Sequence, residues 1–572
     1  MAASSHARSV DLIDTDTERT PLLLAATPAP TTPTSARSKS PKHGTAESIG
    51  RPVPHNEDGE DRDGDAAVEA AEAALNHLRA LLRPRVVALS IALVFLIELG
   101  IGMAIPPTNA VMESIICRQM HPDVVAVLPP LSPANANANA NGTVLAGRFA
   151  GGVALVDDPA CKRPDVQGYL AMLRGWQNTF ESLPGLVGAV PYGILSDRWG
   201  RRPVLGLGLV GISASVAFTY VIFYFSDLVP LWLTWFSAAF QLIGGGGSVV
   251  MAMLYTVVAD VIPPIERATV FFQIAAVFLA SQMIAGPLGG AMLLWDPWIP
   301  LLVSLLVLIL AALSVLIFPE TVYLHDGKGS REEPGLVGND APGMAKLVRR
   351  AREGFLDLRA FVFGNRSIVF LLLSFVFVIL GRYAGEILLQ YSTDRYGWSW
   401  STASMVLTIR NAGSLVTLLA AMPVASWFCT RRLGMESVAK DLWLSRWSGI
   451  LHVVGSFTIA AAANGLVYSF GLAWLALGSG MIATTRSLLN TLVEEHHVGT
   501  LNSLIGFMET VGVSVAGPLL AGSLRAGLDL GGAWIGLPFF TAGMFFIIST
   551  AIVWFFRLPD SRPSRRSGEL PR

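Results

Sequence analysis

Long apolar stretches alternate with short polar segments over most of this chain. A helix needs about 20 consecutive apolar residues to cross the hydrocarbon core of a bilayer, and the chain supplies twelve such stretches. Their approximate bounds are 86–105, 170–195, 203–225, 230–259, 269–294, 297–318, 366–391, 401–424, 447–466, 468–491, 500–523 and 533–557. The pattern predicts an all-α polytopic membrane protein with about twelve transmembrane helices.

The segments outside these stretches differ in composition. Residues 1–65 are rich in Ser, Thr, Pro and acidic residues and contain no apolar run, so we expect a disordered cytoplasmic tail without a cleavable signal peptide. Residues 66–85 are rich in Ala, Leu and Glu and predict a short amphipathic helix. The remaining predicted parts are an N-terminal bundle at 86–318, a cytoplasmic linker at 319–365, a C-terminal bundle at 366–557 and a cytoplasmic tail at 558–572.

Arginine and lysine residues set the expected orientation of the helices. They gather before the first stretch, in the loop 198–202, in the segment 320–366 and in the last residues, and all these regions fall on one side of the membrane. Because cytoplasmic loops carry the excess of positive charge, we expect both termini in the cytoplasm. This side is called the inner end below, and the opposite side the outer end.

Composition argues against several other classes of function. Of all residues, 52% are hydrophobic and 15% are charged, whereas soluble proteins average about 25% charged residues. The net charge is −1 and no basic patch is present, so no nucleic-acid partner is expected. The chain has no phosphate-binding loop, nucleophile elbow or zinc-like Cys and His spacing. We therefore expect neither an enzyme nor a bound metal or cofactor.

The first outer loop, residues 106–168, contains two of the three cysteines, Cys117 and Cys161. Two cysteines in one loop can pair in an oxidising lumen, and two free thiols are the alternative. The loop also holds the sequon Asn141-Gly142-Thr143, which predicts a glycan on Asn141.

A short polar motif separates the second and third stretches. Its residues are Gly193-Ile194-Leu195-Ser196-Asp197-Arg198-Trp199-Gly200-Arg201-Arg202. Glycine permits close backbone approach and a sharp turn, and the Arg residues mark the loop as cytoplasmic. The pattern G-x-x-x-D-R-x-G-R-R resembles the signature loop between the second and third helices of the major facilitator superfamily. A generic basic loop is the alternative, but it would not account for the spacing of Gly and Asp.

The resemblance covers about residues 80–560 and implies two six-helix bundles around a central cavity. In that superfamily the bundles rock between inward-open and outward-open states, usually in a monomer. The resemblance identifies a cytoplasmic latch formed by Gly193, Asp197, Gly200, Arg201, Arg202 and Asp260. Asp260 is expected to pair with Arg201, and Asp197 to face the start of the eleventh stretch.

Other features of the family are only partly present. Pro319-Glu320-Thr321 after the sixth stretch resembles the ending of sugar porters, but nothing else is sugar-specific. Gly286 to Gly290 resembles a motif of drug/proton antiporters. Phe240, however, occupies the place of the fourth-helix Arg of that class, which weighs against an antiporter. The segments 176–193 and 389–401 are most similar to fungal members of the superfamily.

An internal repeat supports the two-bundle organisation. Gly286, Pro287 and Gly290 in the fifth stretch match Gly517 and Pro518 in the eleventh, one half-protein away. Small residues allow helices to pack closely, and Pro bends a helix. We therefore expect these residues at helix–helix contacts.

Away from their first and last residues, the predicted stretches contain eight Asp, Glu, Lys or Arg residues: Glu98, Arg174, Glu181, Arg382, Glu386, Arg410, Arg486 and Glu509. Each would cost about 2.5–3.5 kcal/mol at the bilayer centre, so each needs a partner or a wet cavity. Arg382 and Glu386 lie four residues apart, and Arg174 and Glu181 lie seven apart. Each pair is expected on one helix face.

The candidates for solute binding or proton coupling are Glu181, Glu98, Arg174, Arg382, Glu386, Arg410 and Gln241. Glu181 is the first candidate for proton coupling because it lies near the middle of the membrane with Arg174 on the same helix face. The alternative is that Glu181 only forms a structural ion pair with Arg174. The sequence predicts a secondary active transporter of a small organic solute, coupled to protons, that works by alternating access. A transport-inactive solute sensor and a facilitative uniporter are the alternatives.

The segment Glu18-Arg19-Thr20-Pro21-Leu22-Leu23 fits an acidic dileucine sorting signal for an adaptor protein. It predicts a vacuolar or lysosome-like membrane, with the plasma membrane as the alternative.

Overall fold

The computed structural model of the chain describes residues 60–122, 144–145, 155–156, 159–324, 366–492 and 498–556. The sorting segment Glu18 to Leu23, the sequon at Asn141, most of the linker and the C-terminal tail lie outside the described residues. Two short strands, β1 (Val144–Leu145) and β2 (Leu155–Val156), pair antiparallel between the first two long helices.

The N-terminal half contains six membrane-length helical segments. They are α1 (Glu60–Met120), α3 (Pro164–Trp199), α4 (Arg201–Tyr224), the run η2 (Leu231–Phe236), α5 (Ser237–Gln241) and α6 (Gly246–Val261), α7 (Pro264–Leu293), and α8 (Trp298–Ser314) with η3 (Val315–Ile317). Two further short helices are η1 (Pro159–Lys162) before α3 and η4 (Val322–Leu324) after η3.

The C-terminal half repeats the arrangement. Its segments are α11 (Arg366–Arg382) with α12 (Ala384–Tyr396), α13 (Trp400–Val416) with the π-helical turn η5 (Thr417–Ala421) and α14 (Met422–Arg431), α15 (Ser437–Ala461), α16 (Gly465–Leu477) with α17 (Gly480–Thr491), α18 (Val498–Leu530), and η7 (Gly532–Gly536) with α19 (Leu537–Phe555). The predicted all-α fold with twelve helical segments is confirmed for the described part of the chain.

Ten of these segments are long and apolar enough to cross a bilayer by themselves. The other two are α3 and α15, which carry several charged residues within their length, among them Arg174 and Glu181 in α3 and Asp441 and Arg446 in α15. Such residues are tolerated in a membrane where a helix faces other helices rather than lipid. The polarity of α3 therefore fits its place between the two halves.

The first helix differs from the prediction. α1 runs without interruption from Glu60 to Met120, so neither a separate helix at 66–85 nor a loop beginning at 106 is present. Residues 106–117 are buried, including the apolar side chains of Met112 and Ile116. Burial of this face stabilises the helix beyond the length that a bilayer requires. The first outer loop consequently begins near His121 rather than at residue 106.

The fourth segment is broken near its middle, where one continuous span was expected. Gly244, Gly245 and Gly246 have φ values of 92°, 81° and 69°, which glycine adopts readily and other residues rarely do. A Cβ atom on Gly244 would lie 2.2 Å from the backbone nitrogen of Gly208 in α4. The glycine run thus ends α5, restarts the chain as α6 and brings its backbone against α4.

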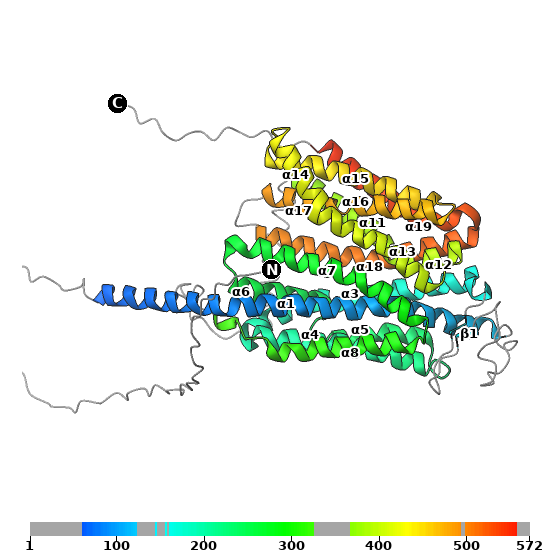
Figure 1. The fold of residues 1–572 in the computed structure, drawn as a ribbon, viewed down its shortest axis with the longest axis horizontal. Coiled ribbons are helices and arrows are strands. Elements are labelled where there is room, and N and C mark those ends of the chain that lie inside the picture. Colours follow the sequence, from blue (N-terminus) through cyan, green and yellow to red (C-terminus); the bar gives the residue numbers. More distant parts are fainter. Residues whose placement is uncertain are drawn as a thin grey trace, which may run out of the picture. The chain divides into compact units, whose positions relative to one another are not determined.

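Two helix pairs make the most extensive contacts between the two halves. α3 packs along α18, and α7 packs along α13; Figure 1 shows the N-terminal half in blue to green and the C-terminal half in yellow to red. Near the outer end, Trp400 and Ala403 of α13 join the same buried apolar cluster as Met112 and the Cys117–Cys161 pair. The apolar core is therefore continuous across the two halves at the outer end.

Candidate functional site

The predicted latch motif lies mostly inside helices rather than in a loop. α3 extends to Trp199 and α4 begins at Arg201, so Gly200 alone makes the turn. Its φ of 107° and a Cβ position only 2.3 Å from Glu320 Oε2 both require glycine. Gly193, by contrast, lies within α3, and a Cβ added there would have no neighbouring atom within 4 Å, so the close approach expected there is absent.

Arg201 is the centre of the charged contacts at this turn. Its side chain is buried and forms ion pairs with Asp197 and, at 3.4 Å, with Asp260 of α6. Its Nη1 also donates to Ser196 Oγ at 2.9 Å. Asp260 therefore faces Arg201 as expected, whereas Asp197 points to Arg201 with 64% of its side chain exposed. Arg202 donates to the carbonyl of Leu316 at 2.6 Å.

Glu320 completes this network, although the sequence suggested only a resemblance to sugar porters for it. Its carboxylate accepts the backbone N–H groups of Arg201 at 2.8 Å and Arg202 at 3.2 Å, which are unpaired donors at the start of α4. The neighbouring Thr321 donates to Asp260 Oδ2 at 3.0 Å. These contacts join α3, α4, α6 and the segment after α8, all within the N-terminal half.

A small cavity lies between the two halves, lined by residues from the outer half of α3. Its volume is about 30 Å³, which is room for a water molecule rather than an organic solute. The polar side chains that line it are Asn109, Arg174, Asn178, Tyr383, Glu386 and Gln390. Asn178 of the N-terminal half donates to the Tyr383 hydroxyl of the C-terminal half. Of the predicted candidates, Arg174 and Glu386 meet here.

Glu181 is connected to this cavity only indirectly. Arg174 Nη1 donates to Gln177 Oε1 at 3.1 Å, and Gln177 Nε2 donates to Glu181 Oε1 at 2.8 Å. Arg174 and Glu181 do lie on one face of α3, as their spacing predicted, but Gln177 bridges them. Glu181 itself does not line the cavity.

Arg382 and Glu386 do not form the pair that their spacing suggested. α11 ends at Arg382 and α12 begins at Ala384, so the seventh segment is interrupted at Tyr383. Tyr383 keeps helical dihedral angles, yet these two described residues form no ion pair with each other. The guanidinium of Arg410 lies against Gly385 instead, where an added Cβ would be 2.6 Å from Nη2.

The two remaining polar candidates also have partners that the sequence did not indicate. Glu98 accepts a hydrogen bond from Gln282 Nε2 of α7 at 3.2 Å, and Asn411 of α13 donates to the Gln282 carbonyl at 3.4 Å. Gln241 donates to Ser215 Oγ of α4 at 3.3 Å, within the N-terminal half. Gln241 therefore braces α5 against α4 and does not line the central cavity.

The repeated glycine motifs lie where the halves touch. A Cβ on Gly517 of α18 would be 2.5 Å from the Gly175 carbonyl of α3, and one on Gly290 of α7 would be 2.1 Å from Ser404 Oγ of α13. Pro287 and Pro518 lie inside α7 and α18. Gly286 has nothing within 4 Å, so only part of the motif is at a contact.

The outer end holds a polar cluster that sequence analysis missed. Glu113 is buried and accepts hydrogen bonds from Lys162 Nζ at 2.6 Å, from Gln167 Nε2, and from the indole N–H of Trp400 at 2.6 Å. Gln390 Nε2 in turn donates to Gln167 Oε1 at 3.0 Å. Trp400 and Gln390 belong to the C-terminal half, so this cluster closes the outer end. We call it the outer clamp.

A disulfide holds the N-terminal side of the outer clamp. Cys117, four residues after Glu113, is bonded to Cys161, the neighbour of Lys162. Beside it, His121 Nε2 and Asp165 Oδ2 are 2.9 Å apart. Burial opposes ionisation of Asp165, but His121 and the backbone N–H of Val166 outweigh it and lower the pKa of Asp165. The sequence signal for the clamp was the apolar pattern around Glu113, which continues the first helix.

Comparisons with known proteins agree with this architecture. The family model described as Major Facilitator Superfamily matches residues 171–517. The MFS-type transporter avaK of Aspergillus versicolor is 30% identical over 486 residues, which are 85% of this chain and 95% of avaK. The MFS efflux pump atnC of Emericella nidulans is 32% identical over 434 residues, 72% of this chain and 80% of atnC.

Among solved structures, the human organic anion transporter MFSD10 is similar with a TM-score of 0.51 and 17% identity, over 82% of this chain and 99% of that protein. This likeness concerns the fold alone. The family model covers more than half of the chain, and avaK matches over most of both lengths. The chain is therefore an integral, multi-pass transporter that belongs to the major facilitator superfamily.

Proposed function

We propose that this transporter exports a small organic solute in exchange for protons, by alternating access of the central cavity between the two halves. The observation that carries the proposal is the convergence of Arg174, Asn178, Tyr383 and Glu386 from both halves on one cavity. A site shared by both halves changes shape whenever they move apart. The direction is supported by the name of atnC, an efflux pump.

Glu386 is the stronger candidate for the coupling acid. In an exchanger, solute and proton displace each other from one site, so the acid must line that site. Glu386 lines the cavity, whereas Glu181 is separated from it by Gln177. Phe240, which replaces the fourth-helix Arg of drug/proton antiporters, packs on Phe218 with ring centroids 5.0 Å apart. Coupling here therefore does not use the fourth segment.

Transport in inside-out vesicles tests this assignment. Vesicles from cells that express the full chain are screened with a library of small organic metabolites under an imposed pH gradient, while pyranine fluorescence reports proton movement. The parent should accumulate a solute in a saturable manner with matching proton exit. Glu386→Gln should lose pH-driven accumulation but keep exchange of labelled for unlabelled solute, because the amide has nearly the same shape but cannot ionise.

The control is Glu436→Gln, which removes an exposed carboxylate far from the cavity and should change nothing. If Glu386→Gln accumulates solute like the parent while Glu181→Gln does not, coupling belongs to Glu181. If solute flux in the parent is saturable but does not depend on the pH gradient, the protein is a uniporter. Solute binding without any flux would indicate a sensor.

The membrane in which the protein works is a further proposal. The dileucine segment supports a vacuolar or lysosome-like membrane through an adaptor protein, and the sequon supports a glycan on Asn141. Leu22→Ala with Leu23→Ala should move a fluorescently tagged protein to another membrane, and an unchanged distribution would count against the signal. A loss of apparent mass after endoglycosidase treatment, absent in Asn141→Gln, tests the glycan.

A further inference from the structure

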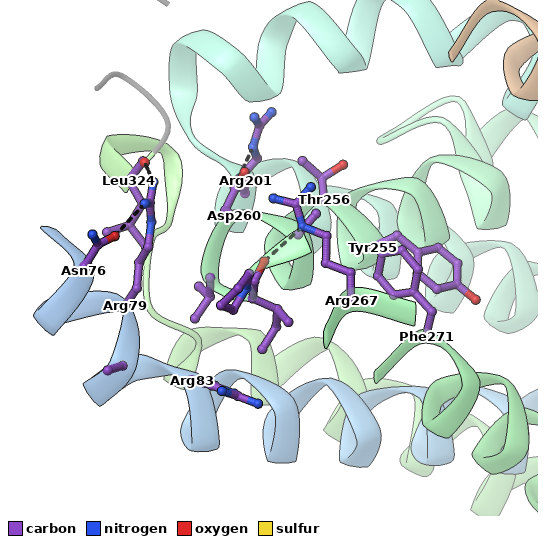
Figure 2. A pocket seen from close by; sticks show the side chains of 15 residues that line it. Asn76, Arg79, Arg83, Arg201, Tyr255, Thr256, Asp260, Arg267, Phe271 and Leu324 are labelled. Atoms are coloured by element: carbon purple, nitrogen blue, oxygen red, sulfur yellow. Dashed lines mark hydrogen bonds and ion pairs between the residues drawn. The ribbon is translucent and has the colours of Figure 1, made fainter. Parts of the chain in front are cut away.

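A large pocket lies away from the central cavity, at the inner end of the N-terminal half. Its volume is about 1050 Å³. Figure 2 shows that its lining side chains come from the first part of α1, from α4, from the end of α6, from the start of α7 and from η4. None of the candidates for solute binding lines it. The transport proposal therefore leaves this pocket without an occupant.

The pocket has an excess of positive charge. Four arginines line it, Arg79, Arg83, Arg201 and Arg267, together with one acid, Asp260. Arg201 is paired with Asp260, and Arg83 with Glu266 beside the pocket. These ion pairs leave Arg79 and Arg267 as the uncompensated charges.

Arg79 and Arg267 form hydrogen bonds only to neutral groups in the described structure. Arg79 donates to the Leu324 carbonyl at 2.6 Å and to Asn76 Oδ1 at 3.2 Å, and its Nε is buried without a partner. Arg267 Nε donates to the Ile262 carbonyl at 2.9 Å. Neither guanidinium has a carboxylate partner among the described residues. Two such cations on one pocket favour an anionic ligand with several acceptor oxygens.

The position of the pocket relative to the membrane further restricts the chemical class of its ligand. Arg83 lies three residues before the first predicted membrane stretch, and Arg267 lies two residues before the fifth. The pocket therefore lies at the level of the inner membrane surface. Its wall also carries the apolar rings of Tyr255 and Phe271, whose centroids are 5.0 Å apart. A charged rim beside an apolar wall at this depth suits a lipid headgroup with its first acyl carbons.

We infer that this pocket binds the phosphorylated headgroup of an anionic phospholipid from the inner leaflet, with Arg79 and Arg267 contacting the phosphate. A bound headgroup ties the first part of α1 to α6 and α7. It also lies beside Arg201 and so next to the network around Glu320. The site is separate from the central cavity and takes a different class of ligand.

The test measures lipid binding to the purified, detergent-solubilised full chain. The probe is a short-chain fluorescent phosphatidylinositol 4-phosphate, with short-chain phosphatidylcholine as the neutral lipid. Arg79→Gln with Arg267→Gln should weaken binding of the anionic probe at least about tenfold, because two charge-assisted contacts are lost. The matched control, Arg198→Gln with Arg432→Gln, removes the same charge at exposed inner positions outside the pocket and should bind like the parent.

Two further variants separate binding from folding. Arg79→Lys with Arg267→Lys keeps the charge and should keep most of the binding, whereas Ala80→Trp fills the pocket from α1 and should block it without any charge change. Each variant is checked by size-exclusion chromatography. The inference is overturned if Ala80→Trp and the glutamine variant both bind like the parent, or if the matched control loses as much affinity. Complete displacement by inorganic phosphate at the same concentration as lipid would assign the pocket to a soluble anion.

Discussion

Glu113 is a buried carboxylate with donors from three different segments of the chain. Lys162 and Gln167 reach it from η1 and α3, and the Trp400 indole reaches it from the other half of the molecule. The ammonium of Lys162 also lies 5.0 Å from the centre of a Trp400 ring, where a cation–π attraction adds to the contact. Removing the charge of this one residue therefore weakens several contacts of the outer clamp at once.

Glu113→Gln should open the outer end. The amide keeps the shape but loses the charge-assisted contacts. Of the direct contacts of Glu113, only the bond from Trp400 joins the two halves, and because it is worth about 1.5–3 kcal/mol, the outward-open population should rise at least about tenfold. The measurement uses a Cys429→Ser background with Ala403→Cys, a buried position in the outer cluster. Labelling by an impermeant maleimide from the outer side should accelerate accordingly. Glu436→Gln is the control, and equal labelling rates in Glu113→Gln and the parent would contradict the role of Glu113.

At the inner end, the turn between α3 and α4 likewise depends on one residue, Gly200. Gly200→Ala should lower the free energy of unfolding by about 1–3 kcal/mol, because its backbone conformation is almost restricted to glycine, and the new Cβ would also push Glu320 away from the start of α4. Thermal unfolding in detergent measures the change. Gly193→Ala, in the same motif but without close neighbours, should be neutral or slightly stabilising. Similar losses in both variants would argue against the steric account.

At the scale of elements, the disulfide decides where the outer end of α1 is held. Cys117 lies in the last turns of α1, and Cys161 lies in η1, the short helix that leads into α3. The bond therefore fixes Glu113 and Lys162 relative to each other, and with them the N-terminal side of the outer clamp. The residues between the two cysteines form the loop that the bond closes.

Cys117→Ser with Cys161→Ser should lower stability and loosen the outer clamp. A bond across a sequence separation of 44 residues stabilises a fold by about 2–4 kcal/mol, chiefly by restricting the unfolded chain. Thermal unfolding should show a lower midpoint, and dithiothreitol should lower the midpoint of the parent but not of the double variant. Cys429→Ser, which removes the buried free thiol of α14, serves as the control. A reductant effect that persists in the double variant would contradict this assignment.

At the scale of the whole molecule, the two halves meet through backbone contacts at glycines. Gly517 lies against Gly175, and Gly290 against Ser401 and Ser404. Thr179 and Ser182 of α3 add hydrogen bonds to Ser514 of α18. Close approach of the backbones allows both pairs of helices to separate and return as rigid units, which is what alternating access requires.

Gly517→Val should hold the halves apart. The added side chain would meet the Gly175 carbonyl, so α3 and α18 have to separate. We expect faster maleimide labelling of Ala403→Cys from the outer side and a loss of transport of at least about tenfold. Gly522→Val lies on the same helix with nothing within 4 Å and should leave both readouts near the parent values. A Gly517→Val protein that labels slowly and transports normally would show that this contact does not close the outer end.

Local patterns were sufficient to predict the twelve helical segments, though not all their bounds, and the family. A bilayer selects apolar stretches of fixed length wherever they occur, and the sharp turn itself is made by Gly200 of one short motif. The spacing of Arg174 and Glu181 also placed them on one helix face. Each of these inferences concerns residues that are close together in the chain.

Contacts between distant segments were decided by tertiary packing alone. Glu113 and Trp400 are separated by 287 positions, and the apolar pattern that continues α1 past Glu113 does not indicate that these two residues meet. Arg382 and Glu386 form no ion pair despite their spacing, and Gln282 rather than an arginine is the partner of Glu98. In a membrane, a buried polar group takes whichever partner helix packing brings within reach. Its partner therefore depends on how the two halves assemble, which helix periodicity does not specify.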